Sequence, residues 1–244
     1  MQLIATCLFG LEAVVSRELK MLGYDDQQVV DGRVVFSSSL SAVCESNIWL
    51  RSAERILLKV GDFSAVTFDE LFIGTESLPW QEYIPSDGEF PVEVSSINSR
   101  LASVPDCQSI IKKAVVEKLK KKYKTDWFEE SGSKYKIVAM LLKDKVTLAF
   151  DTSGTGLHKR GYRDLMGAAP LKETLAAAMI MISRWKWDRM LIDPMCGSGT
   201  IPIEAAMIGQ NIAPGLNRIF AAEEWHFIPN ELWKLTMTRL PARH

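Results

Sequence analysis

The sequence has few of the residues that build metal sites, disulfide frameworks and membrane spans. It contains 4 cysteines and 3 histidines in 244 residues. Cys7, Cys44, Cys107 and Cys196 lie far apart, which excludes paired zinc-ligand spacing and a compact disulfide framework. The longest apolar stretch, at about residues 175–182, is too short to span a bilayer. These absences favour a reduced compartment.

The N-terminus lacks the basic region and the long apolar core of a secretory signal peptide, since it reads Met-Gln-Leu-Ile-Ala-Thr. With the scattered cysteines, this predicts a cytoplasmic protein without a membrane partner. Hydrophobic content of 47% and charged content of 24% are ordinary for a globular chain. The length allows one large domain or two to three small ones.

Charge is distributed unevenly behind a net value of −1. Residues 1–99 carry 6 Lys and Arg against 15 Asp and Glu, whereas residues 100–163 carry 15 against 7. Residues 164–244 carry 8 of each sign. A basic central segment that follows an acidic one favours a polyanion bound at one place.

The first part of the chain has the element order of a ferredoxin-like domain. Periodicity predicts strands at 2–7, 28–30, 33–36 and 54–62, and helices at 11–22 and from Ser38 or Ser39 to about residue 50. Asp31-Gly32 marks a hairpin because both positions tolerate positive φ, and Gly23 is expected to end the first helix. The predicted order is β-α-β-β-α-β.

A second αβ unit follows, at about residues 65–152. Thr67 or Asp69 is expected to start a short helix that Pro79-Trp80 interrupts. Strands are predicted at 90–97, 135–142 and 146–151.

The long helix of this unit, expected to be capped by Asp106, combines an apolar stripe with lysines. Apolar side chains recur every four residues, at Ile111, Val115, Leu119 and Tyr123. The candidate phosphate contacts on the same helix are Lys112, Lys113, Lys120, Lys121 and Lys124. A solvated face opposite the core stripe is the alternative interpretation.

A flexible joint is predicted at residues 152–156, and a cluster of cations and rings follows it. The cluster contains His158, Lys159, Arg160, Tyr162 and Arg163. Such side chains grip phosphate or stack on a base, or they form a hydrogen-bonded hinge, and the residues alone favour neither reading. Pro170 suits the first turn of a helix at about 171–185, which leads to a predicted buried strand at 190–193.

The segment from Asp193 to Thr200 reads Asp-Pro-Met-Cys-Gly-Ser-Gly-Thr and is the most informative in the chain. A strand ending in an acid, then a glycine turn and a helix expected at 200–208, places backbone N–H groups where they hold a carboxylate. No Lys follows Gly199, so this is not a Walker phosphate loop, and the spacing is not that of dinucleotide enzymes. The chemistry suits S-adenosylmethionine, with turn amides at its carboxylate and Asp193 at its ammonium.

Two other interpretations near this loop are weaker. Cys196 at a helix N-terminus suggests a nucleophile, but no flanking histidine supplies a base, so a small residue packed beside the ligand is favoured. Glu223 and Glu224 lie about where a ribose-binding acid is expected. The residues after them, which include Pro229, do not resemble the strand that presents such an acid.

Several stretches together resemble the bacterial THUMP-domain, class I S-adenosylmethionine-dependent RNA methyltransferases. They are Ile4-Ala-Thr-Cys7 with Gly10-Leu-Glu12, Leu157-His-Lys-Arg-Gly-Tyr-Arg163, Ala169-Pro-Leu-Lys-Glu-Thr-Leu175, Asp193 to Thr200, Ala213-Pro-Gly-Leu-Asn-Arg218 and Glu224-Trp225. The most similar group contains the guanine-N2 methyltransferases of the ribosomal RNA large subunit, with tRNA relatives nearby.

The resemblance implies an α+β N-terminal part, with a ferredoxin-like domain at 1–64 and an RNA-binding THUMP domain at 65–152. A linker at 153–169 and the start of an α/β Rossmann-like methyltransferase domain at 170–244 follow. It also implies S-adenosylmethionine as cofactor and structured rRNA or tRNA as partner. The residues expected to line the cofactor are Asp193, Cys196, Gly197, Ser198, Gly199, Thr200, Ala169 and Pro170.

The sequence departs from the family pattern in one respect. Family members carry a later acid for the cofactor and an Asn-Pro-Pro-Tyr or Asp-Pro-Pro-Tyr segment that holds the target base, whereas this chain contains no Pro-Pro. We therefore expect this chain to be truncated before its catalytic motif. Because positioning is most of the catalysis for an activated methyl donor, we expect the chain alone to be inactive or nearly so. The alternatives are a non-catalytic RNA-binding THUMP module and, less favoured, a DNA adenine methyltransferase. The sequence does not determine the oligomeric state.

Overall fold

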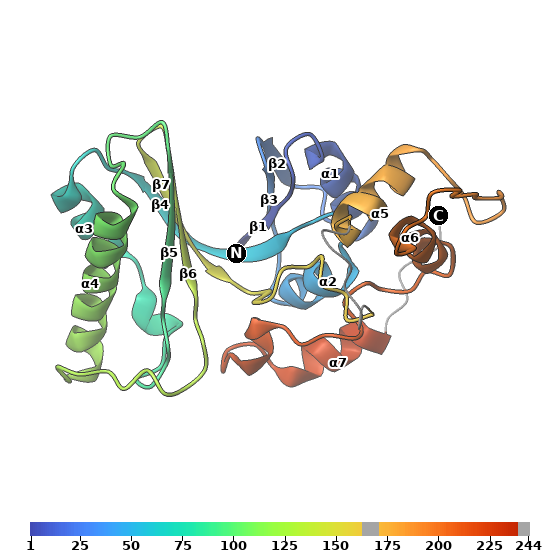
Figure 1. The fold of residues 1–244 in the computed structure, drawn as a ribbon. Coiled ribbons are helices and arrows are strands. Elements are labelled where there is room, and N and C mark those ends of the chain that lie inside the picture. The colour runs from blue at the N-terminus through green and yellow to red at the C-terminus, as the bar shows by residue number, and fades with distance from the viewer. Residues whose placement is uncertain (163–170, 239–244) are drawn as a thin grey trace. The chain divides into compact units, whose positions relative to one another are not determined.

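The computed structural model describes residues 1–162 and 171–238 and contains two compact units (Figure 1). Unit 1 comprises the described residues of Met1–Ile56, Thr152–Glu223 and Ile228–His244. Unit 2 comprises Leu57–Asp151 and Glu224–Phe227. In the described ranges, the helices are all too short or too polar to cross a membrane.

Unit 1 begins with the predicted β-α-β-β-α-β order. The elements are β1 (Gln2–Thr6), α1 (Glu12–Met21), β2 (Gln27–Val30), β3 (Arg33–Ser37), α2 (Ser41–Trp49) and the start of β4 (Arg55–Ser64). Strand β3 pairs antiparallel with both β1 and β2, and Val30 faces Arg33 across the predicted Asp31-Gly32 turn. Gly32 has a φ of +73°, which explains the glycine at this position.

Helix α1 forms because its apolar residues share one face. Val14, Val15 and Leu19 are buried, while the opposite face is charged. Gly23, at a φ of +89°, ends the helix as predicted: its N–H donates to the Lys20 carbonyl, and the next N–H donates to the Leu19 carbonyl.

Unit 2 is a four-stranded sheet with two helices on one face (Figure 1). Its elements after β4 are α3 (Phe68–Ser77), η1 (Trp80–Glu82), β5 (Val92–Ile97), α4 (Val104–Tyr123), β6 (Ile137–Leu142) and β7 (Lys145–Asp151). The hydrogen-bonded order is β4-β7-β6-β5, with β5 and β6 parallel and the other pairs antiparallel. Trp80 and Phe150 meet edge to face in the core at 5.6 Å between ring centroids.

Helix α4 confirms the predicted apolar stripe and corrects its predicted start. Ile111, Val115 and Leu119 are fully buried. The helix begins at Val104, after Ser103 as N-cap, so Asp106 lies in its first turn and does not cap it. An acid in the first turn still interacts favourably with the helix dipole.

The last part of unit 1 is helical. It contains α5 (Glu173–Ile182), α6 (Thr200–Gly209), η2 (Ala221–Glu224), which crosses into unit 2, and α7 (Asn230–Thr238). Leu11, the residue before α1, and Val14 of α1 pack with Ala178 of α5, so this segment shares a core with the ferredoxin-like elements.

The predicted strand at 190–193 is wrong. Residues 190–193 have no strand conformation, and Met190 and Ile192 are 87% and 76% exposed. The apolar run matches a buried strand, but a strand needs hydrogen-bonded neighbours, and none of the described strands pairs with it.

Candidate cofactor loop and RNA-contact residues

The glycine loop, residues 193–200, enters the N-terminus of α6. Gly197 and Gly199 both adopt positive φ, at +52° and +74°, and the Gly199 N–H closes the turn onto the Cys196 carbonyl at 2.8 Å. A Cβ at Gly197 would meet no atom within 4 Å, and one at Gly199 would meet only the Ile203 side chain, at 3.7 Å. The glycines therefore serve the backbone conformation and leave the outer side of the turn open.

The polar groups of this loop are oriented locally. An Asp193 carboxylate oxygen accepts the Met195 N–H at 3.2 Å, and the Ser198 and Thr200 hydroxyls lie 3.2 Å apart. Within the part of the chain that the structure describes, the N–H groups of Gly197 and Ser198 donate to no protein acceptor. These donors stand at a helix N-terminus, the arrangement that binds a carboxylate or phosphate.

Of the other residues predicted to line the cofactor, Cys196 is exposed in the same turn. Ala169 and Pro170 lie outside the described residues, as does Arg163 of the linker cluster.

The predicted flexible joint at 152–156 begins as a buried polar network instead. Thr152 and Ser153 are fully buried and bond to both amide atoms of Asn47, at 2.8 Å and 2.6 Å. The Thr152 hydroxyl also donates to the Ile56 carbonyl, and the Ile56 N–H donates to the Ser153 hydroxyl. Small polar residues suggest mobility in sequence, but here Thr152 and Ser153 each satisfy a buried partner.

Arg218 holds the next part of the linker. Its guanidinium donates to the carbonyls of Gly156 at 2.9 Å and Lys159 at 3.0 Å, and also to that of Thr155. A Cβ at Gly161, where φ is +83°, would lie 2.4 Å from the Asn217 carbonyl oxygen. Residues 155–161 are therefore fixed against the segment around Arg218.

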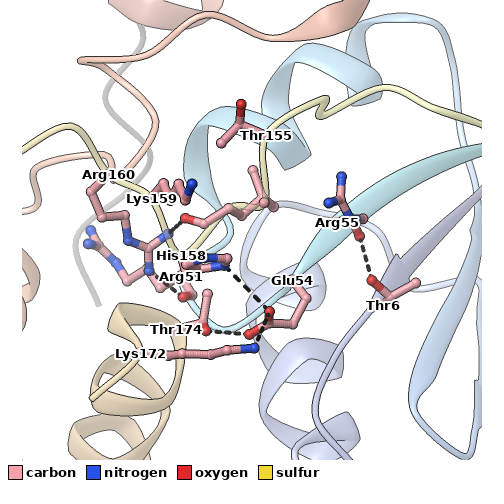
Figure 2. Close-up of polar contacts among 12 residues, drawn as sticks. Thr6, Arg51, Glu54, Arg55, Thr155, His158, Lys159, Arg160, Lys172 and Thr174 are labelled. Carbon is pink, nitrogen blue, oxygen red and sulfur yellow. Dashed lines mark hydrogen bonds and ion pairs between the residues drawn. The ribbon is translucent and has the colours of Figure 1, made fainter. Parts of the chain in front are cut away.

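Arg160, predicted as an RNA contact, is only 3% exposed, and its guanidinium is used within the protein (Figure 2). It donates to the carbonyls of Leu157 at 2.8 Å and of Arg51, and its Nε lies 3.4 Å from a carboxylate oxygen of Glu204 on α6. The Tyr162 hydroxyl donates to the same oxygen at 2.9 Å. This geometry favours the hydrogen-bonded hinge for Arg160 and Tyr162.

Glu54 contacts several other polar residues of this region (Figure 2). One of its oxygens accepts the Thr174 hydroxyl, and the other lies 3.2 Å from the Lys172 ammonium and 3.7 Å from His158 Nδ1. Burial lowers the pKa of His158, while the Glu54 carboxylate acts in the opposite direction. Glu54, the residue before β4, thus holds the start of α5. Of the linker residues that were predicted to contact RNA and that the structure describes, only Lys159 is exposed.

The lysines of α4 divide into paired and exposed groups. Lys112 bonds to the Phe90 carbonyl and to both oxygens of Glu130, so it is held against unit 2 itself. Lys120 and Lys121 pair with acids at 3.3 Å and 2.6 Å. Lys113 and Lys124 are exposed and form no ion pair with a described residue.

Sequence reasoning missed Glu54, Glu204 and Arg218 as organising residues. Glu204 carried a usable signal, since it is the only charge in the apolar run of α6. Arg218 and Glu54 carried none, because their partners lie at least 59 residues away in sequence.

Comparison with known families accounts for most of the chain. Residues 2–57 match the RlmL ferredoxin-like domain, residues 65–151 match the THUMP domain, and residues 160–241 match the RMKL-like methyltransferase domain called UPF0020.

Curated relatives are longer than this chain. It is 54% identical over 233 residues to the "Putative RNA methyltransferase YpsC" of Bacillus subtilis, covering 95% of this chain and 60% of that protein. It is 36% identical over 231 residues to the "Ribosomal RNA large subunit methyltransferase K/L" of Psychromonas ingrahamii, covering 94% of this chain and 31% of that protein.

Solved structures are similar to nearly the whole of this chain. A "predicted N6-adenine-specific DNA methylase" from Listeria monocytogenes is 52% identical with a TM-score of 0.94, over 98% of this chain and 63% of that one. A "putative methyltransferase complexed with SAH" is 47% identical with a TM-score of 0.91, over 97% and 63%. The chain therefore consists of a RlmL-type ferredoxin-like domain, a THUMP domain and residues of an RMKL-like methyltransferase domain, in that order.

Proposed function

We propose that this chain provides the RNA-recognition and cofactor-binding parts of an S-adenosylmethionine-dependent RNA methyltransferase that acts on guanine N2 of ribosomal RNA, or of tRNA. The observation that carries the proposal is the open glycine turn at the N-terminus of α6, in a chain 47% identical to a structure complexed with SAH. The relative named as an rRNA large subunit methyltransferase supports the substrate class.

The residues present fit the methionine end of the cofactor. The unused N–H groups of Gly197 and Ser198 would bind its carboxylate, and Asp193 would bind its ammonium directly or through water. Gly197 leaves room for the cofactor to approach the backbone closely, because the space that a side chain would fill there is open. S-adenosylmethionine held there would supply an activated methyl group, and its transfer to guanine N2 would release S-adenosylhomocysteine and a proton without a covalent enzyme intermediate.

Isothermal titration calorimetry with S-adenosylhomocysteine tests the cofactor half of the proposal. The wild-type chain should bind, and Asp193→Asn should weaken binding about tenfold, the effect of losing one charge-assisted hydrogen bond. Asp188→Asn is the matched control, since Asp188 is an exposed acid that precedes the loop. A folded wild-type chain that binds no S-adenosylhomocysteine would leave the non-catalytic RNA-binding module as the better reading.

Filter binding tests the nucleic-acid half. Structured rRNA and tRNA fragments should bind more tightly than duplex DNA of equal length, and Lys113→Glu with Lys124→Glu should weaken RNA binding and reduce its salt dependence. Lys20→Glu, an exposed lysine at the end of α1, is the control. Preference for the DNA duplex would instead support a DNA adenine methyltransferase, the activity named for the Listeria structure.

A further inference from the structure

A cavity of about 610 Å³ lies in unit 1, where α1, the end of α2, the end of α5 and the end of α6 converge. Its volume is within the range of small-molecule sites in proteins. Residues from four separate segments of the chain line it, so no local sequence motif reveals it. The walls combine rings with cations: Trp49, Trp185, Trp187, Arg17, Arg51, Arg184 and Lys186.

The cations at the walls are largely uncompensated. Arg17, Arg184 and Lys186 form no ion pair with any residue in the described ranges. The one acid that lines the cavity, Glu18, uses its oxygens on the backbone after α2, accepting the N–H groups of Arg51 at 2.7 Å and Ser52 at 3.0 Å. The cavity therefore favours an anion.

Arg51 gives a second, independent indication of a ligand. Its residue is 8% exposed, and its Nη1 is buried without a hydrogen-bond partner in the described structure. Burial lowers the pKa of Arg51, which is the expected effect on a desolvated charge. The Glu18 and Glu204 carboxylates act in the opposite direction, but neither bonds to Nη1, so an anion in the cavity would add a partner for this atom.

The tryptophans give the cavity an aromatic wall. The Trp185 indole donates to the Arg189 carbonyl at 3.0 Å, which fixes its ring, and a Cβ at Gly209 would lie 3.3 Å from that ring. Gly209 thus lets the rings of the 185–187 turn approach the end of α6. Tryptophan faces stack on nucleobases with little regard to base identity.

The cavity is distinct from the glycine loop. The loop meets α6 at Thr200, whereas the cavity is lined by Ile208 and Gly209 at the other end of the helix. A helix of 10 residues is about 15 Å long. One methionine end cannot occupy both places.

We propose that this cavity is a second binding site, which binds a nucleotide. The base stacks on the tryptophan wall, and the phosphate contacts Arg17, Arg51 and the cations of the 184–186 turn. Arginine forks match phosphate geometry, and the rings hold the base without a specific edge contact. A free nucleotide and a splayed residue of single-stranded RNA present the same chemistry.

Calorimetric titration of the chain with GMP, guanosine and inorganic phosphate tests this site. GMP should bind more tightly than guanosine or phosphate alone. Trp187→Ala should weaken GMP binding about tenfold, as should Arg17→Ala, which removes one phosphate contact. Trp127→Ala and Lys20→Ala are matched controls, because Trp127 is 79% exposed as against 77% for Trp187, and Lys20 lies on the same helix as Arg17.

The outcomes separate this site from the cofactor loop. S-adenosylhomocysteine binding should be unchanged in the two cavity variants, so failure at one site leaves the other interpretable. Stronger competition by single-stranded RNA than by GMP identifies RNA as the source, and the reverse identifies a free nucleotide. The proposal is overturned if the folded wild-type chain binds no GMP, if the controls lose as much affinity as the cavity variants, or if phosphate binds as tightly as GMP.

Discussion

Replacing Arg160 by alanine should destabilise unit 1 strongly, because the side chain is buried in a charge pair. Arg160 and Glu204 are 2% and 0% exposed at their side chains, and a second oxygen of Glu204 has no hydrogen-bond partner in the described structure. Removing one partner of a buried pair typically costs about 3–5 kcal/mol, because the remaining charge is uncompensated. The carbonyls of Leu157 and Arg51 also lose a donor. We expect a loss of about 4 kcal/mol.

Urea denaturation followed by circular dichroism measures this loss. Lys159→Ala, the exposed neighbour, should change stability by less than about 0.5 kcal/mol. In a double-mutant cycle, Arg160→Met with Glu204→Leu should cost less than the sum of the single variants by about 2 kcal/mol. An Arg160→Ala variant of wild-type stability that has lost RNA binding would refute this reasoning and restore the phosphate-contact prediction.

Three further perturbations test the surrounding structure. Thr67→Ala removes the capping box of α3 and should cost about 1 kcal/mol in thermal or urea unfolding, whereas Ser103→Ala, at an N-cap without a side-chain hydrogen bond, should cost almost nothing. Gly215→Ala places a Cβ within 2.9 Å of two backbone atoms of α2 and should cost about 2 kcal/mol. That is more than for Gly61→Ala, whose nearest neighbours are atoms at the end of the Leu78 side chain. Burial lowers the pKa of His158 from its ordinary 6.5, so the unfolded chain binds this proton more tightly than the folded chain does. The free energy of unfolding should therefore rise with pH up to about 6.5 and then level off, and His158→Gln should flatten that rise. Equal losses in the paired variants, or an unchanged pH profile, would contradict the respective contacts.

The elements that could be predicted from the sequence are those that depend on short-range patterns. The stripe of α4 and the Asp31-Gly32 hairpin follow from periodicity and turn chemistry within a few residues. The strand at 190–193 was predicted wrongly because an apolar run does not supply the neighbouring strand it needs. The buried hydrogen bonds of Thr152 and Ser153 could not be predicted for a related reason, since their partner Asn47 is over 100 residues away.

The candidate sites follow the same division. The glycine loop could be predicted from the sequence because its turn and its helix are contiguous. The partners of Arg160 and the residues that line the cavity beside Arg51 come from distant segments of the chain. The sequence therefore shows that these residues are charged, but not which groups they contact. A cation cluster in a sequence is therefore ambiguous until the acids that face it are known.

The central claim is that the amides of the turn before α6 hold the carboxylate of the methyl donor. Amide resonances of the isotopically labelled chain during titration with S-adenosylhomocysteine test it most directly. The Gly197 and Ser198 signals should shift and saturate together, while that of Gly32, in the β2–β3 turn, stays in place. Saturable binding that leaves the Gly197 and Ser198 signals unmoved would contradict the account.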